Sequence, residues 1–307
     1  MRKLLILALC FLLLLSGCRA APTGDRPLIV AVNFPAYDFA RAVAGDRAEI
    51  VMLIPPGADA HSFEPSPADM RAIKNCDIFI YTGGESDTWL DDILRSEGDS
   101  RAVVNMLISS GTAPIIDKIT DGHHHDHEID EHVWLAPDKA VLILKSICNA
   151  LIGADAQNEE YYRENCEGYC GAITAEAAAT KDALRKAEHR TICVADRFAY
   201  KYLCDYYALS YVAAFSSCDS FADADAQTVA RLIDRVRDGE FSYVFYNNGG
   251  SSALADLVCA ETGAEKLTLH SVEAVTKEQF EDGITYLDIM KQNDNAIKRG
   301  LGLYVVD

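Results

Sequence analysis

The chain has 307 residues, 50% of them hydrophobic and 24% charged, with a formal net charge of −19. This composition is that of a packed globule and excludes a disordered chain. At about 150 residues per domain, the length predicts two lobes or one large domain. A surface this acidic repels phosphate backbones, so nucleic acid is not an expected partner.

The N-terminal residues have the pattern of a targeting segment. Arg2 and Lys3 precede an apolar run at 4–15, which is shorter than the roughly 20 residues that span a bilayer. The run ends at Ser16-Gly17-Cys18, the small-residue and cysteine pattern of a bacterial lipobox. A plain secretory signal with an incidental cysteine is the alternative.

We therefore predict that residues 1–17 are a lipoprotein signal peptide that is removed and that Cys18 carries the lipid. Residues 18–27, with their proline, threonine, glycine and aspartate, are predicted to be a lipidated, flexible tether. Such a chain is expected on the outer face of the bacterial cell membrane, or on its periplasmic side where there are two membranes. No other stretch of the sequence has the pattern of a membrane span.

Strand and helix patterns alternate along the first half of the chain, which predicts a parallel sheet flanked by helices. The helix that starts at Ser66-Pro67 has an N-cap serine, an early proline and Asp69 at its third position. The predicted strands cover residues 28–34, 49–54, 77–82 and 102–106.

The second half repeats this alternation after a long helical stretch at 155–189 without proline. Its strands are predicted at 191–196, 210–215, 242–247 and 266–270. The fold class is therefore α/β, with two lobes that each hold a mostly parallel four-stranded sheet, joined by one long rigid helix. We assign 28–154 to the N-terminal lobe, 155–189 to the linking helix and 190–307 to the C-terminal lobe.

Ten cysteines occur in the chain, and Cys10 and Cys18 lie in the leader and at the anchor. The other eight include no Cys-x-x-Cys and lack the clustering of a zinc site. An exported protein can pair its cysteines, but these spacings do not decide whether any disulfide forms.

Three histidines occupy loop positions next to predicted strands, where open parallel sheets bind their ligands. His61 follows the second strand, His132 ends a polar loop, and His270 closes the last strand. Neutral imidazole is a donor suited to zinc and similar metals. We therefore predict that the three side chains meet around one ion between the lobes.

Residues 29 to about 301 resemble the metal-specific solute-binding lipoproteins of ABC importers, the zinc and manganese group. Five groups of residues carry the resemblance. In chain order they are Pro56-Gly57-Ala58-Asp59-Ala60-His61-Ser62-Phe63-Glu64-Pro65-Ser66-Pro67; Gly83-Gly84-Glu85 with Trp89; Glu131-His132-Val133-Trp134 with Pro137; Tyr202 with Tyr207-Ala208-Leu209; and Thr285-Tyr286 with Met290 and Asn293. It implies two α/β lobes, a linking helix, and capture of a divalent metal for a membrane permease.

The resemblance also implies a ligand set. His61 and His132 match the family's two histidines, its third position falls at Arg197, and its fourth, usually a carboxylate, falls at His270. An arginine has no lone pair for a metal. Water, Glu131 or Asp196 is expected to complete the coordination, with Arg197 beside the site organising a carboxylate; alternatively, Arg197 makes only a surface salt bridge.

A histidine-rich loop is predicted at 121–132. Its imidazoles are expected to bind divalent metal loosely and favour zinc over manganese, which prefers oxygen ligands. Manganese and iron remain alternative cargoes. The loop histidines that form this secondary site are His123, His124, His125 and His127.

Two other functions compete with metal capture. The segment from His127 to His132 is one residue longer than a His-Glu-x-x-His motif, so a metallohydrolase is not favoured and no enzyme activity is predicted. A surface adhesin or interaction lipoprotein of the same fold is the second alternative.

Overall fold

The computed structural model describes residues 26–58, 63–90, 94, 101–112, 130–215 and 226–303. The predicted leader with Cys18, the predicted ligand His61 and the four histidines of the predicted histidine-rich loop lie outside the described residues. Among the residues described, no helix combines the length and apolar character that crossing a membrane requires.

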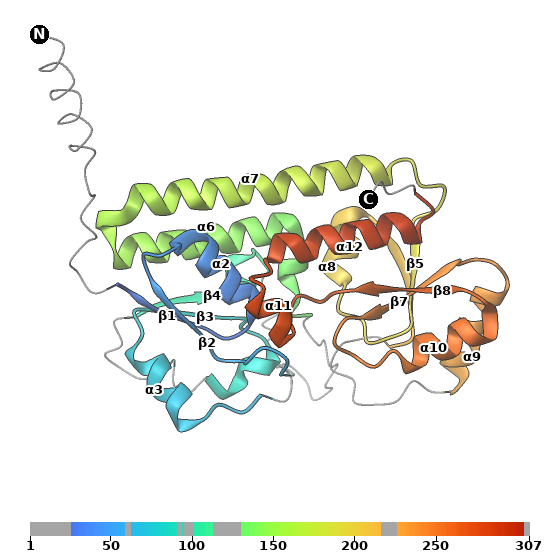
Figure 1. Ribbon diagram of the computed structural model, residues 1–307, viewed down its shortest axis with the longest axis horizontal. Coiled ribbons are helices and arrows are strands. Elements are labelled where there is room, and N and C mark those ends of the chain that lie inside the picture. The colour runs from blue at the N-terminus through green and yellow to red at the C-terminus, as the bar shows by residue number, and fades with distance from the viewer. Residues whose placement is uncertain are drawn as a thin grey trace, which may run out of the picture.

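Each half of the chain forms a parallel four-stranded sheet (Figure 1). The order is β2-β1-β3-β4 in the first and β6-β5-β7-β8 in the second. The strands are β1 (Leu28–Ala31), β2 (Glu49–Met52), β3 (Ile78–Tyr81), β4 (Ala102–Asn105), β5 (Thr191–Val194), β6 (Ser210–Ala213), β7 (Tyr243–Asn247) and β8 (Glu265–Leu269). The predicted strand at 28–34 is shorter than expected because Asn33 caps the next helix, accepting a hydrogen bond from the Ala36 N–H.

One layer of helices runs along both sheets in Figure 1, and further helices pack on the opposite side of each sheet. The shared layer holds α2 (Phe34–Ala44), α6 (Pro137–Ala154), α7 (Glu159–Leu184), α8 (Lys201–Tyr207) and α12 (Tyr286–Gly300). The other helices and turns are α3 (Pro67–Asn75), η2 (Glu85–Leu90), α5 (Met106–Ser109), η3 (Val133–Leu135), η4 (Ala156–Asn158), α9 (Ala226–Arg237), α10 (Ala253–Thr262) and α11 (Lys277–Glu281).

The long helix α7 links the two lobes. Its 26 residues contain no proline, and its buried positions recur every three or four residues, the period of an amphipathic helix. It begins after a short 3-10 turn, so it is shorter than the predicted stretch at 155–189. The two sheets and this helix confirm the predicted fold class.

A single hydrophobic cluster continues through both lobes. It joins Ile29 of the first sheet to Val194 and Leu269 of the second through the shared helical layer. Because opening the lobes would expose part of this cluster to water, the two halves are held together by burial of apolar surface.

Polar contacts also tie the C-terminal helix α12 to the N-terminal lobe. The buried carboxylate of Asp38 on α2 accepts hydrogen bonds from the Tyr169 hydroxyl (2.7 Å) and the Tyr286 N–H (2.9 Å). The Arg41 guanidinium donates to the Ile284 carbonyl oxygen at 2.7 Å. The start of α12 is thereby fixed to α2 and α7, although α12 also packs against β8.

Candidate metal centre

His132 lies at the junction of the two lobes, immediately before the turn η3. Its side chain is buried, as is that of Trp134 two residues later. The Trp134 carbonyl oxygen accepts a hydrogen bond from the Tyr286 hydroxyl (2.7 Å), and its indole N–H donates to the Ser271 carbonyl oxygen (2.8 Å). Contacts from the C-terminal lobe therefore hold the backbone next to His132.

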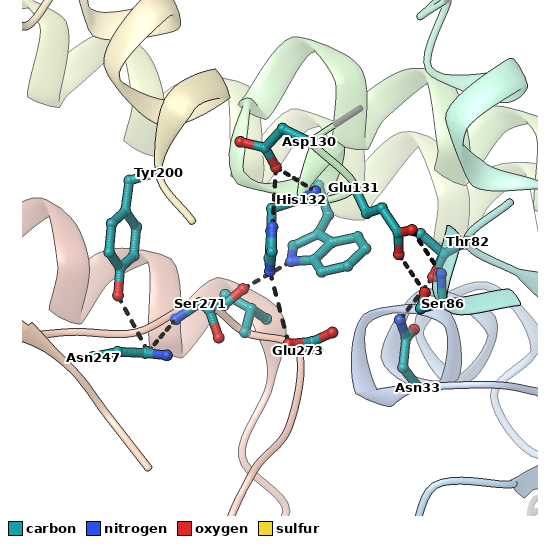
Figure 2. A network of polar contacts seen from close by, with 12 residues as sticks. Asn33, Thr82, Ser86, Asp130, Glu131, His132, Tyr200, Asn247, Ser271 and Glu273 are labelled. Carbon is teal, nitrogen blue, oxygen red and sulfur yellow. Dashed lines mark hydrogen bonds and ion pairs between the residues drawn. The ribbon is translucent and has the colours of Figure 1, made fainter. Parts of the chain in front are cut away.

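The imidazole of His132 faces a carboxylate of the opposite lobe. Its Nε2 lies 3.7 Å from Oε2 of Glu273, and the two side chains are 3% and 14% exposed (Figure 2). On the other edge of the ring, Nδ1 lies 2.9 Å from Oδ1 of Asp130. A nitrogen and an oxygen donor thus point toward one another from segments 141 residues apart in sequence.

His270 is arranged differently from the predicted ligand. It is 3% exposed, and its Nδ1 accepts a hydrogen bond from the Val272 N–H at 2.8 Å. Burial lowers its pKa to about 4, so the ring is neutral and carries its proton on Nε2. In this arrangement neither nitrogen offers a lone pair to a metal, and the assignment of His270 as a ligand stays a prediction.

Glu131 and Asp196, expected near the metal, have structural roles. Glu131 accepts hydrogen bonds from the N–H (2.9 Å) and the hydroxyl of Ser86. A β-carbon on Gly84 would lie 2.0 Å from the Glu131 carboxylate, so a larger residue at that position would displace the Glu131 side chain. Asp196 accepts from the N–H groups of Arg197 (2.7 Å) and Asn247 (2.9 Å). It braces the loop that positions Arg197 after β5.

A small pocket adjoins Glu273 on the side of the N-terminal lobe. Its polar lining comes from Asn33, Thr82, Ser86, Asp87 and Glu273. Figure 2 shows the Asn33 amide directed at Thr82, where it donates a hydrogen bond of 3.1 Å to the hydroxyl. The apolar wall comprises Val32, Ile54, Phe63 and Trp89.

The pocket is electrostatically negative. The pKa of Asp87 is raised to about 6, chiefly by burial and also by the neighbouring charges of Glu131 and Glu273, against a hydrogen bond from the Gly83 N–H that lowers it. Charge of this sign attracts a cation and repels an anion.

The loop that carries His61 is anchored on both sides beside Glu273. Before the loop, the Gly57 N–H donates a hydrogen bond of 2.8 Å to the Val275 carbonyl oxygen. After it, Phe63 lines the same pocket as Glu273 and lies with its ring centroid 6.2 Å from that of Trp89. The described ends of the loop therefore lie near Glu273.

Within the described ranges, no three side chains among histidine, cysteine, aspartate and glutamate are grouped to hold a metal ion. Among the residues that the structure describes, the candidate metal donors that face each other are the pair His132 and Glu273. Sequence reasoning missed Glu273 because it is one of 47 acidic residues in the chain and follows no strand pattern. Its position three residues after the end of the last predicted strand was the available signal.

Residues 29–300 match the model of the family described as zinc-uptake complex component A, periplasmic. The high-affinity zinc uptake system protein ZnuA of Bacillus subtilis is 29% identical over 97% of each chain. The zinc-binding lipoprotein AdcA of Streptococcus pneumoniae is 29% identical over 97% of this chain, which spans only 60% of AdcA.

Solved structures extend this similarity. The Zn(II)-bound ZnuA-like domain of Streptococcus pneumoniae AdcA superposes with a TM-score of 0.75 at 26% identity, covering 91% of this chain and 99% of that domain. The metal-dependent lipoprotein YcdH of Bacillus subtilis gives a TM-score of 0.74 at 27% identity, covering 89% and 99%. The family consists of substrate-binding transport proteins, which confirms the prediction of a binding protein rather than an enzyme. The chain belongs to the periplasmic zinc-uptake component A family.

Proposed function

We propose that this protein captures a zinc ion outside the cytoplasmic membrane and delivers it to the permease of an ABC importer. The observation that carries the proposal is the pair of donors facing each other across the lobes, Nε2 of the buried His132 and Oε2 of the half-buried Glu273, 3.7 Å apart. One ion coordinated by both would cross-link the lobes. The family's description and the names of its zinc-binding relatives support zinc as the cargo.

The proposed ligands are His61, His132 and Glu273, with water at the fourth position of a tetrahedral site. His61 enters because the ends of its loop lie beside Glu273. Two imidazoles and one carboxylate favour zinc over manganese. Arg197 keeps its proton and is not a ligand; we retain it as a cation beside the site.

Delivery rests on the shared core and on the predicted anchor. Because one hydrophobic cluster joins the lobes, we propose that release occurs through small lobe shifts or loop movement on docking to the permease. Lipid on Cys18 would keep the protein near that permease. Two or more acyl chains are needed there, since one anchors only marginally.

Zinc titration of the metal-free mature protein tests the capture site. The wild type and a variant lacking residues 121–127 should each bind one zinc tightly, because the histidine-rich loop contributes only loose sites. His61→Ala, His132→Ala and Glu273→Gln should each weaken the tight site by more than about 100-fold, beyond the usual effect of supporting residues.

The matched control is His189→Ala, which removes an exposed imidazole between α7 and β5 and should leave the tight site unchanged. Tight one-to-one binding that survives in all three ligand variants would refute the proposed ligand set. Growth in zinc-depleted medium tests delivery: a strain lacking the protein should be rescued by the wild type and not by His132→Ala.

A further inference from the structure

Asp130 makes two hydrogen bonds to the same residue. Its Oδ1 accepts the backbone N–H of His132 at 2.9 Å and lies 2.9 Å from the ring Nδ1 of His132 (Figure 2). The first bond fixes the carboxylate against the backbone of the turn, and the second fixes the imidazole against the carboxylate. The Asp130 side chain is 18% exposed, so its bond to the ring is largely shielded from water.

This arrangement determines which ring nitrogen carries the proton. A carboxylate only accepts, so His132 Nδ1 must donate, and in the neutral ring the lone pair then lies on Nε2. Nε2 is the nitrogen that faces Glu273. Asp130 thus presents the metal-binding tautomer of His132 toward the carboxylate of the other lobe.

His270 provides the opposite arrangement in the same protein. Its Nδ1 accepts the Val272 N–H, which places its proton on Nε2. The backbone on both sides of the ring is held by Asn293, whose amide oxygen accepts from the His270 N–H (2.7 Å) and whose amide nitrogen donates to the His270 carbonyl oxygen (2.8 Å). His132 can therefore donate a lone pair from Nε2 to a metal ion, whereas His270 uses its Nδ1 lone pair to accept the Val272 N–H.

We infer that Asp130 is a positioning residue that selects the Nδ1–H tautomer of His132, while the Val272 N–H selects the Nε2–H tautomer of His270. The inference rests on the proposed function, because a lone pair fixed on His132 Nε2 would serve to bind the captured metal ion. Outer partners of this kind orient a metal-bound imidazole and raise its basicity.

Nitrogen-15 spectra of the metal-free protein test the tautomers directly. In the neutral form of each ring, His132 should show a protonated Nδ1 and His270 a protonated Nε2. Asp130→Ala should give His132 a mixture of tautomers or the Nε2–H form. His270 serves as the internal control, and its signals should stay unchanged if the variant is folded.

Asp130→Asn separates the hydrogen bond from the charge. The amide oxygen can accept both bonds, so this variant should keep the Nδ1–H tautomer. Zinc affinity should fall about 10–100-fold in Asp130→Ala, the usual effect of losing a supporting partner, and less than about tenfold in Asp130→Asn. A charge effect alone would lower affinity equally in both variants and would overturn the inference.

An Nε2–H tautomer of His132 in the wild type, or an unchanged tautomer in Asp130→Ala, would also overturn it. These spectra need no metal, so they are independent of the proposed function. Wild-type protein with the expected tautomers and no tight zinc site would refute zinc capture and leave the role of Asp130 in place.

Discussion

The indole nitrogen of Trp134 donates a 2.8 Å hydrogen bond to the backbone oxygen of Ser271, 137 residues later in the chain. Trp134 lies two residues after His132, and Ser271 lies two residues before Glu273. The bond therefore fixes the distance between the two segments that present the facing donors. Tyr286 adds a second link, because its hydroxyl donates to the Trp134 carbonyl oxygen at 2.7 Å.

Replacement of Trp134 by phenylalanine should lower both stability and zinc affinity. Phenylalanine keeps an aromatic ring in the core but lacks the indole N–H. The buried Ser271 carbonyl therefore loses its hydrogen-bond donor, which typically costs about 1–3 kcal/mol of unfolding free energy. Urea unfolding of the metal-free protein and zinc titration measure the two effects.

A double-mutant cycle with Tyr286→Phe provides the control. Both bonds meet at Trp134, so the stability losses of Trp134→Phe and Tyr286→Phe should couple by about 0.5 kcal/mol or more. Additive losses together with unchanged zinc affinity would show that these bonds do not set the spacing of the donors.

Much of the fold follows from sequence patterns that act locally. The parallel strands are short apolar runs bounded by turn residues, and α7 lacks proline and has a regular apolar period. Ser66 and Asp69 form the predicted cap of α3, each side chain bonding to the other's backbone N–H. Helix starts of this kind are encoded within four residues and need no tertiary contact.

The site was less predictable because long-range contacts position it. His132 stands out in the sequence as a histidine that ends a polar loop, and its role as a ligand stays a prediction. The segment carrying Glu273 has no periodic pattern, and its place is set by hydrogen bonds such as Gly57 N–H to Val275 O. His270 stands out by residue type as well, but β8 ends at Leu269 and the buried ring accepts a hydrogen bond from the Val272 N–H.

The metal-free protein should lose stability as the pH falls below about 6.5, in part because of His270. Burial lowers the pKa of His270 to about 4, so the unfolded chain takes up this proton before the folded one does. The contribution is fully present above pH 6.5 and is lost as the pH falls toward 4. At pH 5 the loss amounts to about 2 kcal/mol.

His270→Asn should remove this pH dependence, since an amide oxygen can still accept the Val272 N–H and does not titrate. The comparison is the change in unfolding free energy between pH 7 and pH 5 in the two proteins. An equal change in both would show that His270 is not the group responsible. The exposed His189, replaced by asparagine, is the matched control and should reproduce the wild-type profile.

Asp294 should contribute the opposite pH dependence. This buried carboxylate on α12 accepts hydrogen bonds from the hydroxyls of Thr180 (2.9 Å) and Tyr207 (3.1 Å). Its pKa is raised to about 7, chiefly by burial and also by the charge of Glu176, although both hydrogen bonds and Lys298 act to lower it. Its contribution to stability is present below pH 4 and is lost as the pH rises through 7.

Asp294→Asn should therefore gain stability relative to the wild type as the pH rises from 5 to 8, by up to about 3 kcal/mol. Urea midpoints at the two pH values measure the gain. Asp238→Asn, which neutralises an exposed carboxylate, should show a much smaller pH-dependent difference. A constant offset of Asp294→Asn at both pH values would contradict the raised pKa.

The cysteines of the described ranges should remain reduced without added reductant. The seven that the structure describes are all free thiols, and every one except the half-buried Cys259 is buried. Cys166 and Cys170 approach most closely, with sulfur atoms 3.9 Å apart on one face of α7, well beyond the roughly 2.05 Å of a disulfide. Burial raises the pKa of Cys193 and of Cys204 to about 12, which suppresses the reactive thiolate.

Alkylation followed by peptide mass mapping tests this arrangement. In the native protein at pH 8, Cys259 should react first, and the buried thiols at least about 100-fold more slowly, since they must wait for local opening. After unfolding without reductant, all seven should be labelled as completely as in a sample reduced beforehand. A shortfall at Cys166 and Cys170 that reductant restores would reveal a disulfide between them and contradict the free-thiol arrangement of α7.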